Sequence, residues 1–431
     1  MKIFDKIKRT GLMIAVAAVS LTACNKLELD PTPIPTPDAS SLPTLDSMLK
    51  GDASFSLFYS ALKRAKLNTQ LGVAALRFTV FAPNNDAIVA SLGVPDAATA
   101  AAYLSTLSDA TITGLVSYHI VPQTITAAGI PADFPNFEYP SVLNPAPSIS
   151  PLLRLSTFPS RRGAFAWVNN IPVTAVDIMA SNGVMHKVAR VVQPPSADLW
   201  SRIQTDAELT YLKAAIARAD SGVAVGARLQ DALNTSVNPS AIGSNLTIFA
   251  PTDAAMKDFL DTALTKAIIS LLHLPYPNAQ AAAIGLVTNF GTLLISNPAA
   301  IPDIPGYPPG LGTQIALVLT PTLAKGIVAY HILSSQSGPY APPGIRVFSV
   351  NIPTSATGVK TLLNSAGGPY ALHPGVTVQA TFAPGLPVVA AATVKGLANA
   401  GASNVIIGLT SSDQHYVNGV IHKIDQVLLP Q

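Results

Sequence analysis

The chain has 431 residues, of which 49% are hydrophobic and only 11% charged, and its formal net charge is +3. That charge belongs to the first 23 residues, because residues 24–431 hold 22 basic and 22 acidic side chains. A balanced chain without a basic patch or tail is not expected to bind nucleic acid, and so few charges leave few candidate acids and bases for catalysis.

The chain starts like a bacterial lipoprotein precursor. Basic residues from Lys2 to Arg9 precede an apolar run over 11–19, and Leu21-Thr-Ala-Cys24 resembles the site where such proteins are cleaved and acylated. A transmembrane anchor is the alternative, but this run is shorter than the roughly 20 residues that a spanning helix needs. We therefore expect a signal peptide over 1–23, a lipid on Cys24, and a location in the cell envelope, on the outer membrane and exposed at the surface.

Residues 24–43 are predicted to form a stalk. Five prolines fall within residues 25–43, which favours an extended polyproline-type conformation of about 3 Å per residue. Cys24 is also the only cysteine of the chain, so we expect no disulfide within one molecule.

Helical spacing of apolar side chains predicts a helix over 45–67, with Phe55, Phe58 and Leu62 on its buried face. A strand ending at Phe81 follows, then a helix capped by an asparagine or aspartate, and an alanine-rich helix over 96–107. Strands and turns occupy the rest of this half, up to 173–179 and a closing strand after Asn182-Gly183. A second helix, over 199–219, repeats the opening one.

Three sequence motifs occur twice in the same order. Thr79-Val-Phe-Ala-Pro matches Thr247-Ile-Phe-Ala-Pro, and Tyr118-His-Ile-Val matches Tyr330-His-Ile-Leu. The third motif, Asn182-Gly-Val-Met-His-Lys-Val, returns as Asn418-Gly-Val-Ile-His-Lys-Ile, and seven of the thirteen positions from 182 and from 418 are identical. Asn-Gly favours the positive φ of a tight reversal, and Pro194 or Pro430 ends the strand that follows. The chain is therefore an internal duplication.

These motifs resemble those of the fasciclin domain, and the resemblance covers nearly all of residues 44–431. It implies an α+β fold with two tandem domains, 44–195 and 199–431, each a small β-sandwich or wedge with several packed helices. The second copy follows the family pattern more closely. In the first copy, Asn84 stands where the family has threonine, and Ala189 stands where it has a late aspartate.

The motif positions are interpreted as structural. Tyr118-His119 suits a ligand or proton-transfer site, but the alternative is a buried pair tied to backbone groups, since no acid or cysteine accompanies both copies. The motif positions are Phe81, Pro83, Tyr118, His119, Asn182, Gly183, His186, Phe249, Pro251, Asp253, Tyr330, His331, Asn418, Gly419, His422 and Asp425.

The second copy is longer than the first by two insertions. The interval from Thr247 to His331 holds about 44 residues more than the interval from Thr79 to His119, and about 24 more separate His331 from Asn418. Asp303 is the only charged residue between Lys266 and Lys325. Two interpretations remain open for this stretch: additional core, or an uncharged surface for a ligand or partner.

No catalytic, cofactor-binding or metal-binding motif is present. Gly-x-Ser-x-Gly, His-Glu-x-x-His, phosphate-loop and dinucleotide fingerprints are all missing, and His415 and His422 have poor spacing for a metal. We expect a non-enzyme: a surface-anchored adhesion or matrix-binding lipoprotein with an extracellular protein or glycan ligand. The alternative is a tethered glycan or small-molecule capture protein working with an uptake system, which the presence of only two tryptophans disfavours.

Overall fold

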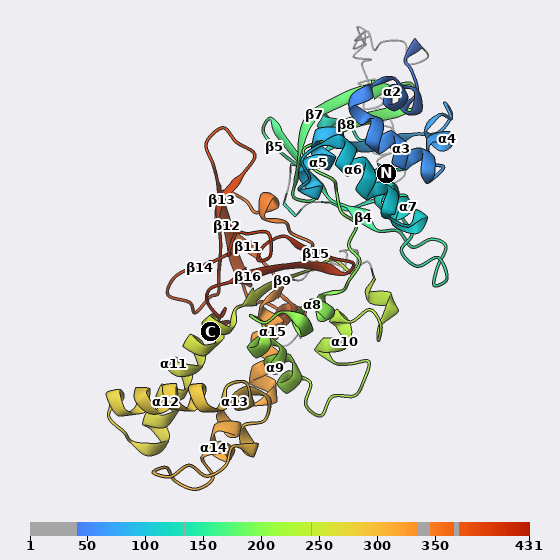
Figure 1. Ribbon diagram of the computed structural model, residues 1–431. Helices are drawn as coiled ribbons and strands as arrows, with labels where there is room; N and C mark the ends of the chain where they lie inside the picture. The colour runs from blue at the N-terminus through green and yellow to red at the C-terminus, as the bar shows by residue number, and fades with distance from the viewer. Residues whose placement is uncertain (1–40, 133, 136, 243, 334–344, 366–369) are drawn as a thin grey trace, which may run out of the picture. The chain divides into compact units, whose positions relative to one another are not determined.

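The computed structural model describes residues 41–132, 134–135, 137–242, 244–333, 345–365 and 370–431 (Figure 1). The predicted signal peptide, Cys24 and nearly all of the predicted stalk lie outside the described residues. Within the described part, no single helix has the length and hydropathy to cross a membrane, although two bent helix pairs meet that test by length and composition.

The first copy of the repeat is built from short helices and one main sheet. Its helices are α2 (Leu45–Gly51), α3 (Ser56–Arg64), α4 (Asn68–Leu71), α5 (Asn85–Leu92), α6 (Ala97–Thr106) and α7 (Asp109–Tyr118), with 3-10 turns η2 (Ala53–Phe55) and η3 (Ala127–Gly129). Its strands are β1 (Phe78–Pro83), β2 (Ile120–Val121), β3 (Tyr139–Pro140), β4 (Ser156–Thr157), β5 (Pro159–Arg162), β6 (Phe165–Val168), β7 (Ile171–Ala180) and β8 (Gly183–Val188).

The two motif strands of the first copy lie side by side in that sheet. The six-stranded order is β2-β1-β8-β7-β6-β5, and β1 pairs with β8 in parallel from Phe78 opposite Gly183 to Pro83 opposite Val188. Both strands are buried almost throughout, because helices and further strands cover them. A small sheet of β3 and β4 is separate.

The second copy repeats this arrangement with more helices. They are α8 (Leu199–Thr205), α9 (Thr210–Ala219), α10 (Leu229–Leu233), α11 (Asp253–Leu272), α12 (Tyr276–Phe290), α13 (Leu293–Ser296), α14 (Leu311–Val318), α15 (Pro321–Tyr330) and α16 (Leu362–Ser365), with 3-10 turns η4 (Pro239–Ala241), η5 (Pro298–Ala300) and η6 (Ser349–Asn351). The strands are β9 (Leu246–Pro251), β10 (Ile332–Leu333), β11 (Thr357–Val359), β12 (Val376–Phe382), β13 (Val389–Lys395), β14 (Ser403–Asn404), β15 (Gln414–Tyr416) and β16 (Gly419–Ile424).

The second copy has two four-stranded sheets where the first has a single six-stranded one. Their orders are β10-β9-β16-β15 and β11-β12-β13-β14. The motif strands β9 and β16 again pair in parallel, from Leu246 opposite Gly419 to Pro251 opposite Ile424. The register of the motif strands is therefore the same in both copies, and the mixture of helices and sheets agrees with the expected α+β class.

Two long helices expected from the sequence are each broken by an aspartate. The predicted helix over 45–67 is α2, η2 and α3, and the predicted helix over 199–219 is α8 and α9. Asp52 ends α2, and its side chain accepts from the Ser54 amide; Asp206 ends α8, and its side chain accepts from the Glu208 amide at 2.9 Å. An aspartate that hydrogen-bonds its own chain two residues later favours a turn over a continuing helix.

Each breaking aspartate also has a tertiary contact. Lys423 Nζ lies 2.7 Å from a carboxylate oxygen of Asp206, and Lys187 Nζ lies 4.0 Å from a carboxylate oxygen of Asp52. These lysines belong to the repeated Asn-Gly motif, so each breaking aspartate also pairs with the motif strand of its own copy.

The remaining helix predictions for the first copy have mixed outcomes. The helix after the Phe81 box is confirmed as α5, whose cap is Asn84, and the alanine-rich helix is confirmed as α6, whose cap is Asp96. The helix α7, which follows α6 after only two residues, was not anticipated.

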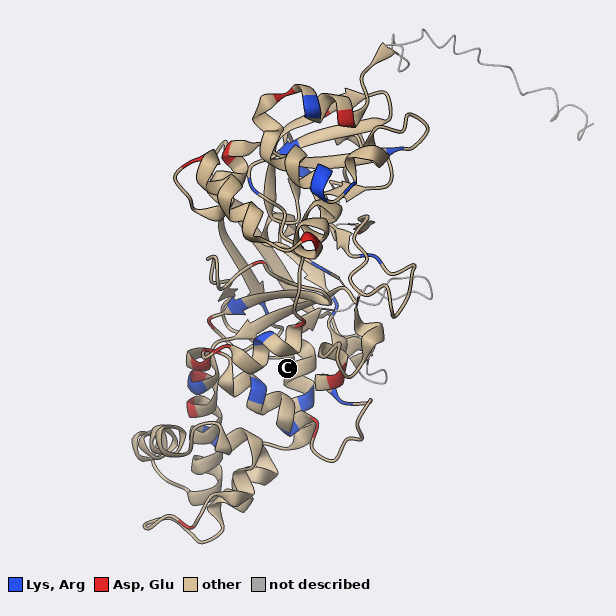
Figure 2. Cartoon of the chain, turned by 45° about the vertical axis from the view of Figure 1, so that its right-hand side comes forward, with Lys and Arg blue, Asp and Glu red and all other residues tan. Residues whose placement is uncertain are grey.

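The first insertion of the second copy forms additional hydrophobic core. Part of α11, with α12, α13 and α14, makes a group of helices without strands, and Figure 2 shows them almost free of charged side chains. Buried residues from this group, including Ala283, Leu286, Leu294 and Ile315, belong to the same hydrophobic cluster as Ile216 on α9. The interpretation as extra core is thus correct for the inward side of the insertion.

The two copies pack against each other, and Pro43–Gln431 form one compact unit. Phe158 and Trp167 of the first copy share a hydrophobic cluster with Phe348 and other residues of the second. The Trp167 indole donates to the carbonyl of Pro387 at 3.1 Å, and Arg162 donates to the carbonyl of Ile352 at 2.8 Å.

Candidate functional site

The repeated asparagine ties the closing hairpin to the first helix of its copy. The Asn182 side-chain oxygen accepts from the Leu45 amide at 2.9 Å, and its side-chain nitrogen donates to the carbonyl of Leu71 at 2.8 Å. Asn418 makes the same pair of bonds, with the Leu199 amide at 3.0 Å and the Leu233 carbonyl at 2.9 Å. Both asparagines are fully buried, so they complete the backbone hydrogen bonding of the core.

The repeated glycine is needed because another strand approaches closely. A Cβ atom on Gly183 would lie 1.9 Å from the carbonyl oxygen of Phe78, and one on Gly419 would lie 2.4 Å from that of Leu246. Gly183 has a φ of +148°, as expected from the Asn-Gly signal. Gly419 is not among the positive-φ residues, so the expectation of a positive φ was wrong there, and the close approach is the reason common to both copies.

The histidines of the closing strands are each held by two backbone groups. His186 accepts from the Asp177 amide at 3.2 Å, and its other ring nitrogen lies 2.7 Å from the Ile125 carbonyl; His422 repeats this with Asp413 and Val347 at 3.3 and 2.8 Å. Each ring stacks on the phenylalanine of its box, Phe81 or Phe249, with the centroids 5.6 Å apart. The boxes end at Pro83 and Pro251, each the last residue of its strand.

The Tyr-His pairs are buried in the same manner. His119 Nδ1 lies 2.8 Å from the Leu115 carbonyl and Nε2 accepts from the Val192 amide at 3.0 Å, while His331 makes these contacts with Ile327 and Leu428 at 2.8 and 2.9 Å. Burial lowers the pKa of both His119 and His331 to about 4. The hydroxyls of Tyr118 and Tyr330 donate to carbonyls of Ser156 and Gly375. None of these polar atoms is free to act on a ligand.

The acidic motif residues also cap and brace the backbone. Asp253 accepts from the Thr210 hydroxyl and the Tyr211 amide, and in the first copy Asn85 takes the corresponding place by accepting from the Leu57 amide at 3.0 Å. Asp425 accepts from the Asn404 amide at 2.7 Å. Asn84 caps α5 just as Thr252 caps α11, so the departure from the family at position 84 preserves the cap.

One buried cluster was not anticipated from the sequence. Arg346 donates to His415 Nε2 at 2.8 Å and to the carbonyls of Ser244 and Val417, and its guanidinium lies 4.9 Å from the ring centroid of Phe158 in the other copy. Burial lowers the pKa of Arg346 to about 10, and burial together with the Arg346 charge lowers that of His415 well below its usual value. A single arginine carries no repeat signal, and its partners come from three separate segments, around Phe158, around Ser244 and in the hairpin of His415 and Val417.

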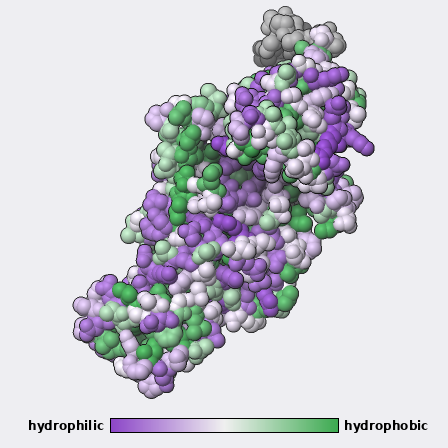
Figure 3. Space-filling model, in the orientation of Figure 1, coloured by the Kyte–Doolittle hydropathy of each residue, from purple (hydrophilic) through white to green (hydrophobic). Residues whose placement is uncertain are grey.

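The outward side of the helical insertion is the candidate binding surface. Large apolar side chains are exposed there, and Figure 3 shows hydrophobic residues interspersed with polar ones over these helices. We define this as the helical surface, with the residues Leu271, Tyr276, Ile284, Leu317 and Val318.

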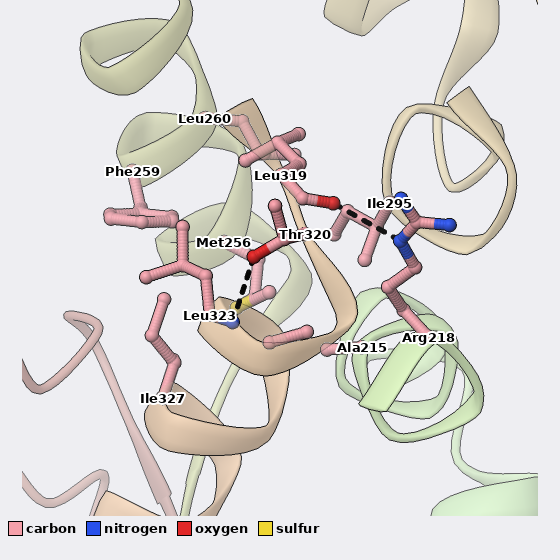
Figure 4. Close-up of a pocket in the computed structure, with 11 residues that line it drawn as sticks. Ala215, Arg218, Met256, Phe259, Leu260, Ile295, Leu319, Thr320, Leu323 and Ile327 are labelled. Atoms are coloured by element: carbon pink, nitrogen blue, oxygen red, sulfur yellow. Dashed lines mark hydrogen bonds between the residues drawn. The ribbon is translucent and has the colours of Figure 1, made fainter. Parts of the chain in front are cut away.

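A small apolar pocket lies at the base of this insertion (Figure 4). Met256 and Leu260 of α11, Leu323 and Ile327 of α15, and Ile295 of α13 line it, and Arg218 closes one side by donating to the Leu319 carbonyl at 3.0 Å. Its cavity volume is about 30 Å³, which holds about one water molecule. Any recognition by this region must therefore use its surface.

Comparison with known proteins supports the resemblance seen in the motifs. The sequence model of the Fasciclin domain matches residues 53–194. "Protein sll1483" of Synechocystis sp. is 33% identical over 152 residues, covering 35% of this chain and 74% of that protein. A FAS1 domain pair from the insect cell adhesion molecule fasciclin I matches 87% of this chain and 97% of its own, with 13% identity and a TM-score of 0.31.

Two animal relatives are much longer than the matched region. The transforming growth factor-beta-induced protein ig-h3 of Sus scrofa is 29% identical over 161 residues, and that of Oryctolagus cuniculus is 28% identical over 159 residues. Each match covers 36% of this chain but only 20% of the relative. Fasciclin domains are generally adhesion or extracellular-matrix modules and are typically non-enzymatic. From its repeated motifs, its match over residues 53–194 and its Synechocystis relative, this chain belongs to the fasciclin family.

Proposed function

We propose that this chain is a surface-anchored adhesion or matrix-binding lipoprotein whose helical surface makes the contact. The observation that carries the proposal is the large uncharged insertion in the second copy, where Asp303 is the only charged residue between Lys266 and Lys325. Connecting loops tend to be short and polar, whereas this insertion builds whole helices and leaves Tyr276 60% and Leu317 76% exposed. Exposed apolar side chains on a rigid frame suit a protein interface.

The chemistry of this surface favours a protein partner over a glycan. Sugars usually bind on platforms of several exposed aromatic rings, whereas Tyr276 is the one aromatic side chain of the helical surface, and Trp167 and Trp200 are buried at 1% and 5% exposure. The sheet β11-β12-β13-β14 lies in the interval that holds the second insertion, and its buried residues join the core shared by the two copies.

Binding through the helical surface is expected to be nearly independent of salt. Since few charges lie there to be screened, affinity for a matrix protein at 0.05 M and 0.5 M salt should differ less than about threefold. The measurement is retention of the chain on a panel of immobilised matrix proteins and polysaccharides, repeated with Ile284→Glu/Leu317→Glu.

The matched control for this experiment is Leu152→Glu. Leu152 is 85% exposed in the first copy, so the same charge is added without touching the insertion. We expect the double variant to lose at least tenfold in retention and the control to bind normally. Equal binding by wild type and double variant, or affinity that collapses in high salt, would refute the proposal.

Membrane attachment is proposed to depend on Cys24. The thiol is the acceptor for acylation, so Cys24→Ala should leave an unprocessed precursor or release the protein into the aqueous phase of a detergent partition. The wild type should enter the detergent phase, and labelled palmitate should appear on it alone. If both proteins partition identically, the chain is not a lipoprotein anchored at this residue.

A further inference from the structure

The first copy contains a much larger apolar cavity than the second at the corresponding place. It lies between α3, α5, α6 and α7, and its volume is about 190 Å³, against about 30 Å³ in the second copy. When the repeats are aligned on their shared motifs, α3 corresponds to α9, α5 to α11, and α7 to α15, and the corresponding helices contact each other in both copies. Leu92, Leu107 and Leu115 of the first cavity then correspond to Leu260, Leu319 and Ile327 of the second pocket.

An arginine marks the same edge of both cavities. Arg64 donates to the carbonyls of Leu104 and Leu107, and Arg218 donates to those of Ala316 and Leu319. These bonds satisfy the free carbonyls at the end of the preceding helix in each copy. The helices around the cavity and the arginine at its edge are therefore the same in both copies, while the cavity volume differs about sixfold.

The second copy fills the space with side chains that the first copy lacks. Phe259 lines its pocket where the first copy has Ser91, and Ile295 comes from the insertion, which has no counterpart (Figure 4). Protein interiors are close-packed, and an apolar space of this size between helices leaves its lining side chains with fewer packing contacts. The filled copy shows that the frame can be packed, so the open one is better explained by an occupant.

The lining identifies the chemistry of that occupant. The interior is aliphatic and aromatic, formed by Phe58, Ile88, Leu104 and Val116 among others, and no charged side chain lines it. His119 also lines it, but both of its ring nitrogens are engaged by backbone groups. The exposed lining residues Tyr103, Thr111 and Gln193 are uncharged and carry hydroxyl or amide groups.

We propose that this cavity of the first copy binds the alkyl chain of a small free amphiphile with an uncharged polar head group. A cavity of about 150 Å³ lined by such side chains accommodates a benzene molecule, so 190 Å³ suits an alkyl chain of roughly six to eight carbons. The head group lies at the exposed residues, where Thr111 and Gln193 offer hydrogen bonds. This site is independent of the proposed helical surface, which belongs to the other copy.

The test is calorimetric titration of 1-octanol into residues 43–431, the compact unit of the chain. We expect saturable binding of one octanol per chain with a negative heat-capacity change, because apolar surface is buried. Sodium octanoate is expected to bind at least tenfold more weakly, since no cation lines the cavity to pair with its carboxylate. In the absence of octanol, the protein should not associate with phosphatidylcholine vesicles, because the cavity admits one short chain and the proposed ligand is free in solution.

Two substitutions and their equivalents in the second copy locate the site. Thr111→Phe places a ring at the exposed edge, and Leu115→Phe enlarges a wall residue; their matched controls are Leu323→Phe and Ile327→Phe. We expect the first pair to weaken octanol binding at least tenfold and the second pair to leave it unchanged, with circular dichroism confirming that each variant is folded.

Several outcomes would overturn the assignment. Absence of saturable octanol binding means that the cavity is only a packing defect. If Thr111→Phe and Leu115→Phe both bind octanol normally, octanol binds elsewhere. The same conclusion follows if Leu323→Phe and Ile327→Phe weaken octanol binding as much as the first-copy variants do. Tighter binding of octanoate than of octanol contradicts an uncharged head group, and association with vesicles alone points to a membrane surface instead.

Discussion

Replacing Gly183 with alanine is expected to destabilise the first copy severely. The added Cβ would lie 1.9 Å from the carbonyl oxygen and 2.9 Å from the amide nitrogen of Phe78, and both are backbone atoms that no side-chain rotation can move. Since β1 and β8 are the parallel pair inside the six-stranded sheet, relieving this clash means separating them. We expect a loss above about 4 kcal/mol in the free energy of unfolding, measured by urea denaturation.

Gly326→Ala is the control for this experiment. Gly326 lies within α15, nothing lies within 4 Å of its added Cβ, and its φ is ordinary for a helix, so alanine should stabilise by about 0.5–1 kcal/mol. Gly419→Ala, with its nearest backbone contact at 2.4 Å, should also be strongly destabilising. A soluble Gly183→Ala protein with an unchanged urea midpoint would show that close strand approach does not explain the repeated glycine.

Acidification from pH 6.5 to pH 4 is expected to destabilise both copies. Burial lowers the pKa of His119 and His331 from 6.5 to about 4, so each is neutral in the fold but charged in the unfolded chain over this range. The unfolded state then binds more protons, and stability falls as the pH falls. Each histidine contributes about 3 kcal/mol that is present above pH 6.5 and lost by pH 4.

The hydrogen-bond geometry also predicts that stability falls as the pH falls. Nε2 of His119 accepts from the Val192 amide, and Nε2 of His331 accepts from the Leu428 amide, so protonation would place two donors against each other in a buried site. Burial also lowers the pKa values of His186 and His415, so these two histidines also make the fold less stable as the pH falls.

The measurement is the urea midpoint between pH 7.5 and pH 4, for wild type and for His119→Gln. At pH 7.5 the variant should lose about 1–3 kcal/mol, because buried backbone groups lose a partner. Its further loss on acidification should be smaller than that of the wild type, since one titrating group has been removed. Equal wild-type stability at pH 7.5 and pH 4.5 would contradict the buried neutral histidines.

The duplication and the correspondence of its motifs between the two copies could be predicted from sequence because each depends on short local patterns. Asn-Gly before an apolar strand, a Phe-Ala-Pro box before a capped helix, and a Tyr-His pair before a short strand each specify backbone geometry over a few residues. When such patterns recur in order, the same elements recur, and the registers of β1 with β8 and of β9 with β16 agree position by position.

Other features depended on residues far apart in the chain. Asp206, at the second helix break, pairs with the buried Lys423 from the far end of the same copy, and the buried Arg346 is surrounded by groups from both copies. Periodicity predicts a helical face, but it does not record a partner that arrives from another segment.

The sequence by itself determined the family, the two copies and the residues that hold each closing hairpin. At those positions the residue type alone specifies the local hydrogen bonding and the space available to the backbone. The tertiary structure alone decided that one copy keeps a cavity of about 190 Å³ while the other fills it to about 30 Å³. That difference depends on Phe259 and on Ile295, which reach the pocket from separate helices. Packing density is a property of side chains brought together by the whole fold, and no short sequence pattern encodes it.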